Sequence, residues 1–163
     1  MFQLLDWRLR LFCIFCFILS IGMIIGQLIS NVKTRKKLRT LVNDQITLTP
    51  KEFFNLRNRK TMDNKQHISS SYSITGVYVL FNETKNLVYV GQGKNVLSRV
   101  NSHFTGSGNG DVYADYKYGD EFKIKLVSLV SSGYASLNDL ERAMINTYNS
   151  YERGYNRNRG NRR

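Results

Sequence analysis

Cysteine is nearly absent from this sequence. The only two, Cys13 and Cys16, lie in the apolar N-terminal run, so the polar remainder holds none. This excludes a disulfide framework for that remainder and suits a reducing compartment. A zinc site would need further soft ligands, and the only histidines, His67 and His103, lie far away in the sequence. We interpret both cysteines as small apolar residues, with palmitoylation as the alternative.

Acidic side chains are also scarce. The 163 residues include 12 Asp and Glu against 24 Lys and Arg, a formal net charge of +12. Residues 31–71 alone hold ten basic and three acidic side chains. Such an excess indicates a polyanionic partner, either nucleic-acid phosphate or anionic lipid. A basic surface that serves only solubility is the alternative.

Charge is missing altogether from residues 11–29, LFCIFCFILSIGMIIGQLI. A helix of this length spans about 28 Å, close to the ~30 Å hydrocarbon core of a bilayer. Trp7 just before it fits an interfacial anchor. A cleaved signal peptide is disfavoured because QLISNVKTRKK offers no small-x-small cleavage pattern. We expect a short flank over residues 1–10 and a retained transmembrane helix over residues 11–30.

The charges on either side of this run predict its orientation. The preceding flank carries Asp6, Arg8 and Arg10, whereas five basic residues follow at positions 33, 35, 36, 37 and 39. Because positive flanks stay on the inner side, the N-terminus is expected outside and the C-terminal part in the cytoplasm. The sequence therefore predicts a single-pass protein of the cell membrane.

A basic connector is expected over residues 31–71. Its first part could extend the membrane helix or lie on lipid headgroups. LTPKEFF predicts a short helix, because Thr49 and Glu52 form a capping box and Pro50 suits the first turn. The polar stretch that follows predicts a linker ending near Ser71. The connector is either a solvated spacer or an electrostatic strip that holds lipid or nucleic acid.

The pattern changes from residue 74 onward. ITGVYVLFN and LVYVGQG alternate and are rich in β-branched and aromatic residues, and ETKN between them predicts a turn. A four-residue loop places Tyr78 opposite Gly91 and Leu80 opposite Tyr89, with both phenols on one face. A one-residue slip would separate the phenols. In the register with the four-residue loop, Gly91 leaves open space across from Tyr78, as the floor of a pocket.

Helices and a third strand are expected after the hairpin. Residues 94–104 predict a short helix with Arg99 and His103 four positions apart on one face, and GSGNGD at 106–111 predicts a flexible loop. FKIKLVSLV, residues 122–130, predicts a strand, and a helix follows from Ser136. Glu141 falls on the apolar stripe of that helix. A buried carboxylate is costly unless it is paired or binds a metal.

These motifs together resemble the GIY-YIG nuclease family over roughly residues 74–158. The resemblance rests on GVY at 76–78, YVG at 89–91, GYN at 154–156 and the side chains Arg99, His103 and Glu141. Valine replaces isoleucine in both tripeptides and keeps the β-branched shape. The resemblance implies an α/β (α+β) fold, in which helices flank a small three-stranded antiparallel sheet. We assign this domain to residues 72–158.

The resemblance also implies phosphodiester hydrolysis with one divalent metal ion, Mg²⁺ or Mn²⁺, per active site. It implies that Tyr78 activates the attacking water and that Tyr89 positions the water or the phosphate. Arg99 would neutralise charge in the transition state, and His103 would relay a proton or contact phosphate. Glu141 would bind the metal and Asn156 would organise its surroundings.

The chemistry is coherent on general grounds. Attack on a phosphodiester adds negative charge to the nonbridging oxygens, so a guanidinium and a cation are useful groups. Mg²⁺ tolerates a single carboxylate when water and phosphate complete its shell. A free phenol has a pKa near 10, so we expect nearby positive charge from Arg99, Lys94 and the metal to lower it. A basic pH optimum follows.

Each of these residues also has a plainer interpretation. Strand tyrosines usually pack, an arginine on a short helix is usually solvated, and Glu141 could pair with a lysine. Asn156 could end a helix in the left-handed conformation. Only the joint pattern favours a catalytic site.

The tail after Asn158 is rich in arginine, and we expect residues 159–163 to be disordered and to contact phosphate. No zinc finger or helix-turn-helix pattern accompanies the domain, so low sequence specificity is expected. The favoured function is a membrane-anchored endonuclease acting on nucleic acid, DNA above all, in defence against or exclusion of incoming phage or plasmid DNA. It would act as a homodimer if both strands are cut.

Two other functions fit the same sequence. One is a catalytically inactive tether that binds DNA through the basic connector and tail. The other is a small membrane protein whose basic strip binds anionic lipid.

Overall fold

The computed structural model describes residues 3–59 and 73–161 of the chain. The chain divides into two units, Met1–Lys37 and Leu38–Arg163, and each is described by itself. The linker expected to end near Ser71 lies largely at residues 60–72, outside the described residues.

The first unit consists of helix. The helix α1 covers Gln3–Asn43, so its last turns belong to the second unit. Within the described residues, Leu9–Asn43 is the one helix that is long and apolar enough to cross a membrane, by length and composition only. From Leu9 to Val32 its large apolar side chains are exposed. The expected transmembrane helix at residues 11–30 lies inside this span and stays a prediction.

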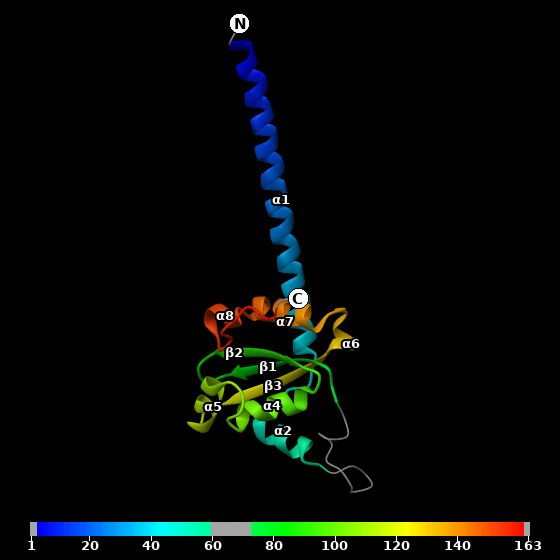
Figure 1. Cartoon of the computed structure of the whole chain (residues 1–163), viewed down its shortest axis with the longest axis vertical. Helices are drawn as coiled ribbons and strands as arrows, with labels where there is room; N and C mark the ends of the chain where they lie inside the picture. Colours follow the sequence, from blue (N-terminus) through cyan, green and yellow to red (C-terminus); the bar gives the residue numbers. More distant parts are fainter. Residues whose placement is uncertain (1–2, 60–72, 162–163) are drawn as a thin grey trace. The chain divides into compact units, whose positions relative to one another are not determined.

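The second unit is built on a three-stranded antiparallel sheet in the order β2-β1-β3 (Figure 1). The strands are β1, Gly76–Asn82, β2, Leu87–Gly93, and β3, Phe122–Ser128. In the hairpin Tyr78 pairs with Gly91 and Leu80 with Tyr89. The predicted fold class and the predicted register are both confirmed.

Helices cover both faces of the sheet (Figure 1). One face packs against α2, Pro50–Arg57, α4, Val96–Phe104, and α5, Gly110–Lys117. The other face packs against α7, Leu137–Tyr148, and the last turns of α1. The short helices α6, Leu129–Ser132, and α8, Ser150–Arg153, flank α7. Because strand side chains alternate, Tyr78 and Leu80 enter the α4 face while Val77 and Val79 enter the α7 face.

The packed unit begins well before the expected boundary at residue 72. Leu38 and Val42 of α1 are buried against α7 and the sheet, and Phe53 of α2 is buried against α4. Leu48 forms a β-bridge with Ile124. Much of the connector expected at residues 31–71 therefore supplies core side chains. The predicted capping box of Thr49 and Glu52 is confirmed.

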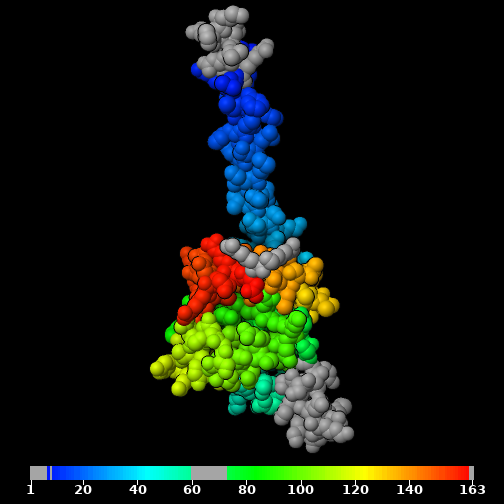
Figure 2. All heavy atoms as spheres, in the orientation of Figure 1, coloured from blue at the N-terminus to red at the C-terminus, as the bar shows by residue number. Residues whose placement is uncertain are grey.

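Two further differences concern the second half of the unit. The loop expected at 106–111 ends in α5, because the Asn109 side chain accepts from the backbone N–H groups of Asp111 and Val112 and caps the helix. The C-terminal segment also follows a defined path as far as Asn161, and in Figure 2 it (red) adjoins the surface of residues 73–104 (green). Arg159 pairs with Glu152 at 2.8 Å, so residues 159–161 have a defined position where disorder was expected, and residues 162–163 lie outside the described residues.

Candidate active site

A polar hollow of about 380 Å³ lies at the free edge of β2, and we call it the edge pocket. Its lining comes from β1, β2, α4, α7 and the segments before α5 and after α8. Five of the six predicted catalytic residues line it, namely Tyr78, Tyr89, Arg99, Glu141 and Asn156. Since β2 is an edge strand, side chains from both faces of the sheet reach this one place.

Gly91 makes room for the phenol of Tyr78. A Cβ atom at Gly91 would lie 2.3 Å from the Tyr78 hydroxyl oxygen. The phenol therefore lies across the glycine, and the space freed by the missing side chain is filled. This corrects the expectation of open space opposite Tyr78, although Gly91 does line the edge pocket.

His103 lies beneath Tyr78 and is buried. Its Nε2 is 2.9 Å from the Tyr78 hydroxyl oxygen, and its Nδ1 accepts from the backbone N–H of Asn109 at 2.9 Å. A neutral imidazole has one donor and one acceptor, so acceptance at Nδ1 places the proton on Nε2. His103 therefore donates to the oxygen of Tyr78.

The surroundings of His103 decide its protonation state, on which the expected roles of proton relay and phosphate contact depend. Burial, and then the Arg99 charge, lowers the pKa of His103 to about 4. A protonated ring would carry a hydrogen on Nδ1, and this hydrogen would face the N–H of Asn109. Protonation of His103 would therefore break its hydrogen bond with Asn109. His103 does not line the edge pocket. Both ring nitrogens of His103 are engaged, Nδ1 with Asn109 and Nε2 with Tyr78, so the ring is placed as a hydrogen-bond donor to Tyr78.

Both phenols are protonated more firmly than a free tyrosine. Burial raises the pKa of Tyr78 far above 10, and the nearby Arg99 charge opposes this effect only in part. Burial also raises the pKa of Tyr89, and Arg99 again opposes it while the Glu141 charge reinforces it. The expectation that positive charge lowers the Tyr78 pKa below its usual value is wrong for the chain alone, because desolvation is the larger effect.

The two predicted cationic residues differ in position. Arg99 of α4 lines the edge pocket, and its side chain is exposed. Lys94 is exposed and lies outside the pocket lining. The Lys94 backbone carbonyl accepts from the hydroxyls of Ser73 and Thr75, which holds the turn before α4. The structure therefore brings only Arg99 to the phenols.

Glu141 reaches the edge pocket from α7 and is 8 % exposed. Its Oε2 accepts from Gln92 Nε2 at 2.9 Å and from the Asn161 backbone N–H at 3.3 Å. Burial raises its pKa, and these two donors and the Arg99 charge oppose the shift. Within the described residues no group of three His, Cys, Asp or Glu could hold a metal ion, so Glu141 is the available carboxylate at this site.

Asn156 is fastened to the free edge of β2. Its side-chain Oδ1 accepts from the Val90 N–H at 2.9 Å, and its Nδ2 donates to the Val90 carbonyl at 2.7 Å. The Tyr155 N–H donates to the Val88 carbonyl. The GYN segment thus satisfies the backbone of an edge strand and closes one side of the pocket.

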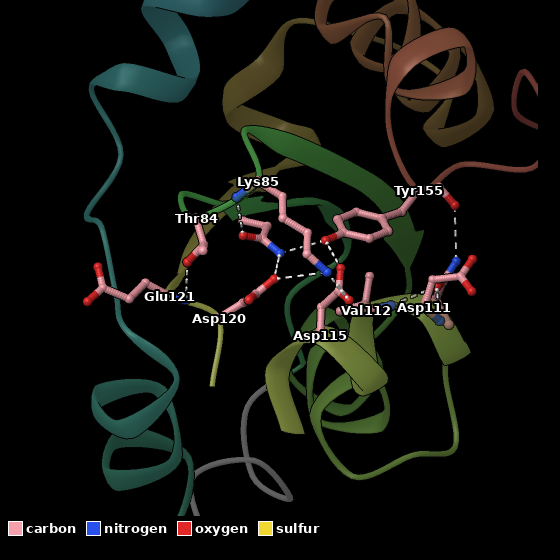
Figure 3. Close-up of polar contacts among 10 residues, drawn as sticks. Thr84, Lys85, Asp111, Val112, Asp115, Asp120, Glu121 and Tyr155 are labelled. Atoms are coloured by element: carbon pink, nitrogen blue, oxygen red, sulfur yellow. Dashed lines mark hydrogen bonds and ion pairs between the residues drawn. The ribbon is translucent and has the colours of Figure 1, made fainter. Parts of the chain in front are cut away.

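A polar cluster beyond the pocket holds Tyr155 in place (Figure 3). The Tyr155 hydroxyl donates to Asp115 at 2.7 Å and accepts from Asn82 Nδ2 at 2.7 Å. Lys85 pairs with Asp115 at 2.6 Å and lies 3.5 Å from Asp120. Because Tyr155 directly precedes Asn156, this cluster also fixes the position of the GYN segment.

Sequence reasoning missed three residues that shape the site. Gln92 contacts Glu141, Asn138 contacts Gln92, and Asn109 orients His103. For Gln92 a signal was present, because strand alternation places it on the α7 face where Glu141 is expected. The contact between Asn109 and His103 joins a backbone amide to a side chain across a loop, which no residue pattern indicates.

Comparison with protein families agrees with this geometry. The sequence profile of the GIY-YIG catalytic domain matches residues 74–156. Comparisons with curated proteins and with solved structures gave no match. The matched range contains both tyrosine tripeptides, Arg99, Glu141 and the GYN segment, and it covers half of the chain. The chain therefore belongs to the GIY-YIG family of nucleases.

Proposed function

We propose that this chain is a membrane-anchored, metal-dependent endonuclease that hydrolyses phosphodiester bonds of DNA at the cytoplasmic face of the cell membrane. The observation that carries the proposal is the meeting of Tyr78, Tyr89, Arg99 and Glu141 around one hollow of about 380 Å³. Two phenols, a guanidinium and a buried carboxylate at one place are the groups that phosphodiester hydrolysis needs.

Tyr78 is the proposed acceptor of the proton of the attacking water. His103 donates to its oxygen and Arg99 lies beside it, and both interactions favour the phenolate. Tyr89 is half-buried beside Tyr78, with ring centroids 6.1 Å apart, and is suited to hold the water or a phosphate oxygen. Arg99 compensates the charge that develops on the nonbridging oxygens.

Glu141 is the proposed ligand of Mg²⁺ or Mn²⁺. The donor set fits, because it offers a hard oxygen in a polar pocket, and Mg²⁺ accepts one protein carboxylate when water and phosphate complete its shell. When bound, such an ion supplies positive charge to the scissile phosphate and lowers the pKa of a coordinated water. Gln92 and the Asn161 amide hold Oε2 of the carboxylate.

The membrane anchor is proposed from the apolar part of α1, with the five basic residues after Val32 on the cytoplasmic side. Eight residues separate Ile29, where the apolar run ends, from Leu38, the first core side chain of the catalytic unit. Even fully extended they reach only about 30 Å. The length of this connection therefore keeps the catalytic unit tethered to the proposed anchor over a short distance.

This confinement supports a biological role in defence or exclusion. A nuclease held at the membrane meets entering DNA at high effective concentration and meets little of a chromosome. The chain supplies one such pocket, with Glu141 as its carboxylate, so a homodimer would bring two active sites together to cut both strands.

A cleavage panel tests the activity. The full chain in detergent micelles is incubated with supercoiled plasmid, single-stranded DNA and RNA, each with Mg²⁺ or Mn²⁺. We expect plasmid nicking by the wild type and a loss of at least about 100-fold in Tyr78→Phe, which removes one oxygen atom. Binding of every nucleic acid without cleavage would favour the inactive tether.

The anchor is tested separately by its topology. A tag placed after Arg163 should be reached by antibody only after the cells are permeabilised, whereas a tag before Met1 should be reached on intact cells. Release of the chain from membranes by alkaline carbonate would contradict a transmembrane anchor.

A further inference from the structure

The side chain of Gln92 connects the edge strand of the sheet with α7. Its Nε2 lies 2.9 Å from Glu141 Oε2 and 2.7 Å from Asn138 Oδ1. Asn138 and Glu141 are three positions apart on α7, so both face β2. Gln92 points to this face because strand side chains alternate, while its neighbour Gly91 lies under Tyr78.

The orientation of both amides follows from the chemistry of the carboxylate. An ionised carboxylate only accepts hydrogen bonds, so Gln92 must direct its NH₂ group, and not its carbonyl oxygen, toward Glu141. The second hydrogen of that NH₂ group points to Asn138, which must then present its oxygen. Two hydrogen bonds thus link the three side chains, and the charge on Glu141 fixes the direction of both.

The two oxygens of Glu141 are consequently unequal. Oε2 accepts from Gln92 and from the Asn161 backbone. Among the residues that the structure describes, no donor contacts Oε1. The carboxylate is held through one oxygen, and the other is left for a ligand that enters the edge pocket.

We propose that Gln92, supported by Asn138, is a positioning residue that presents Oε1 of Glu141 to the divalent cation. This inference rests on the proposed metal-dependent function. A site with one protein carboxylate depends on how well that carboxylate is held, because no second ligand restores its position. Gln92 therefore acts on metal affinity and does not touch the reacting atoms.

The test measures binding of Mn²⁺ alone to the full chain in detergent micelles, from the fall of the free Mn²⁺ signal in electron paramagnetic resonance. We expect one site in the wild type and its loss in Glu141→Gln. Gln92→Leu keeps the bulk but not the donor, and its Mn²⁺ affinity should fall about 10-fold or more. The matched control is Gln45→Leu, since the Gln45 side chain donates to the Leu41 carbonyl at the end of α1 and lies outside the lining of the edge pocket.

Cleavage kinetics supply a second readout. In Gln92→Leu the Mn²⁺ concentration for half-maximal cleavage should rise by the same factor as the dissociation constant, while the rate at saturating Mn²⁺ stays within about threefold of the wild type. A purely structural role would instead lower the saturated rate and leave the metal dependence unchanged. Asn138→Ala removes only the support of Gln92 and should weaken Mn²⁺ binding less than Gln92→Leu.

The outcomes separate the two proposals. Wild-type Mn²⁺ affinity in Gln92→Leu, with binding lost in Glu141→Gln, overturns the role of Gln92 and leaves the nuclease proposal intact. A wild-type chain that neither binds Mn²⁺ nor cleaves overturns both. If Gln92→Leu does not fold, Gln92→Asn replaces it, because the shorter side chain cannot reach both partners, and unchanged Mn²⁺ affinity in that variant overturns the proposal equally.

Discussion

The hydroxyl oxygen of Tyr78, a residue that lines the edge pocket, lies 2.9 Å from Nε2 of the buried His103. The Asn109 amide fixes the tautomer by donating to the other ring nitrogen. His103 thus donates to Tyr78 at all times, and its effect on the phenol is to favour the ionised form. The two residues act as a unit.

Replacing His103 should change the pH dependence of cleavage. His103→Phe removes the donor, so the Tyr78 pKa rises further and the cleavage rate at pH 8 falls by about 10- to 100-fold. Because only the phenolate accepts a proton, the wild-type rate should increase with pH up to at least pH 9, and the variant profile should shift to higher pH. His103→Gln, which can offer an N–H, should recover part of the rate. An unchanged profile in His103→Phe would contradict the assigned role.

The stability of the chain should fall in mild acid because of the same histidine. Burial lowers its pKa to about 4 in the folded chain, against about 6.5 in the unfolded chain. Between pH 4 and pH 6.5 the unfolded chain binds more protons than the folded chain. The contribution of neutral His103 to the free energy of unfolding is therefore complete above pH 6.5 and is lost as the pH falls toward 4. The slope is at most about 1.4 kcal/mol per pH unit. Thermal unfolding from pH 7 to pH 4 should show this slope in the wild type and a smaller one in His103→Asn.

A single methyl group at Gly91 should inactivate the site. The new Cβ would lie 2.3 Å from the Tyr78 hydroxyl oxygen and displace the phenol, so the cleavage rate of Gly91→Ala should fall by about 100-fold or more. Gly110→Ala is the matched control, since no atom lies within 4 Å of that position.

A double variant shows whether the effect acts through the phenol. If it does, Gly91→Ala combined with Tyr78→Phe should be no slower than Tyr78→Phe alone. Additive losses would indicate that Gly91 acts through another group.

The core should depend on a residue outside the matched family range. Phe53 of α2 is fully buried against α4 and β3, so Phe53→Ala should lower the free energy of unfolding by about 3–5 kcal/mol. Leu56→Ala on the same helix is the control, because Leu56 is 38 % exposed. Urea denaturation followed by far-ultraviolet circular dichroism measures both. A loss in Phe53→Ala as small as that of an exposed residue would show that α2 does not belong to the core.

Local patterns were sufficient for the sheet and for five of the residues that line the edge pocket. The hairpin register follows from alternation and loop length, which predict that Tyr78 lies opposite Gly91, as the structure has it. Glu141 was singled out because a carboxylate on an apolar helix stripe is costly. Both arguments need only the spacing of residues within one element or one hairpin.

Contacts between segments that lie far apart in the sequence cannot be predicted from such local patterns. Leu38 and Val42 are buried by α7, about a hundred residues further on, and their own surroundings in the sequence are basic and polar. The depth of Tyr78 depends on α4 and on the loop before α5, so burial outweighed the expected effect of Arg99 on its pKa. The charge of Lys94 suggests a place at the site, but Lys94 is exposed and does not line the edge pocket.

Nicking of supercoiled plasmid by the full chain in micelles with Mg²⁺ or Mn²⁺, compared between the wild type and Glu141→Ala, tests the central claim most directly. The edge pocket predicts nicking by the wild type, abolished by chelation, and a loss of at least about 1,000-fold in Glu141→Ala. Glu121→Ala, which changes an exposed carboxylate outside the pocket lining, should cleave like the wild type. Cleavage by Glu141→Ala at the wild-type rate, or no cleavage by a folded wild-type chain with either metal, would contradict the account.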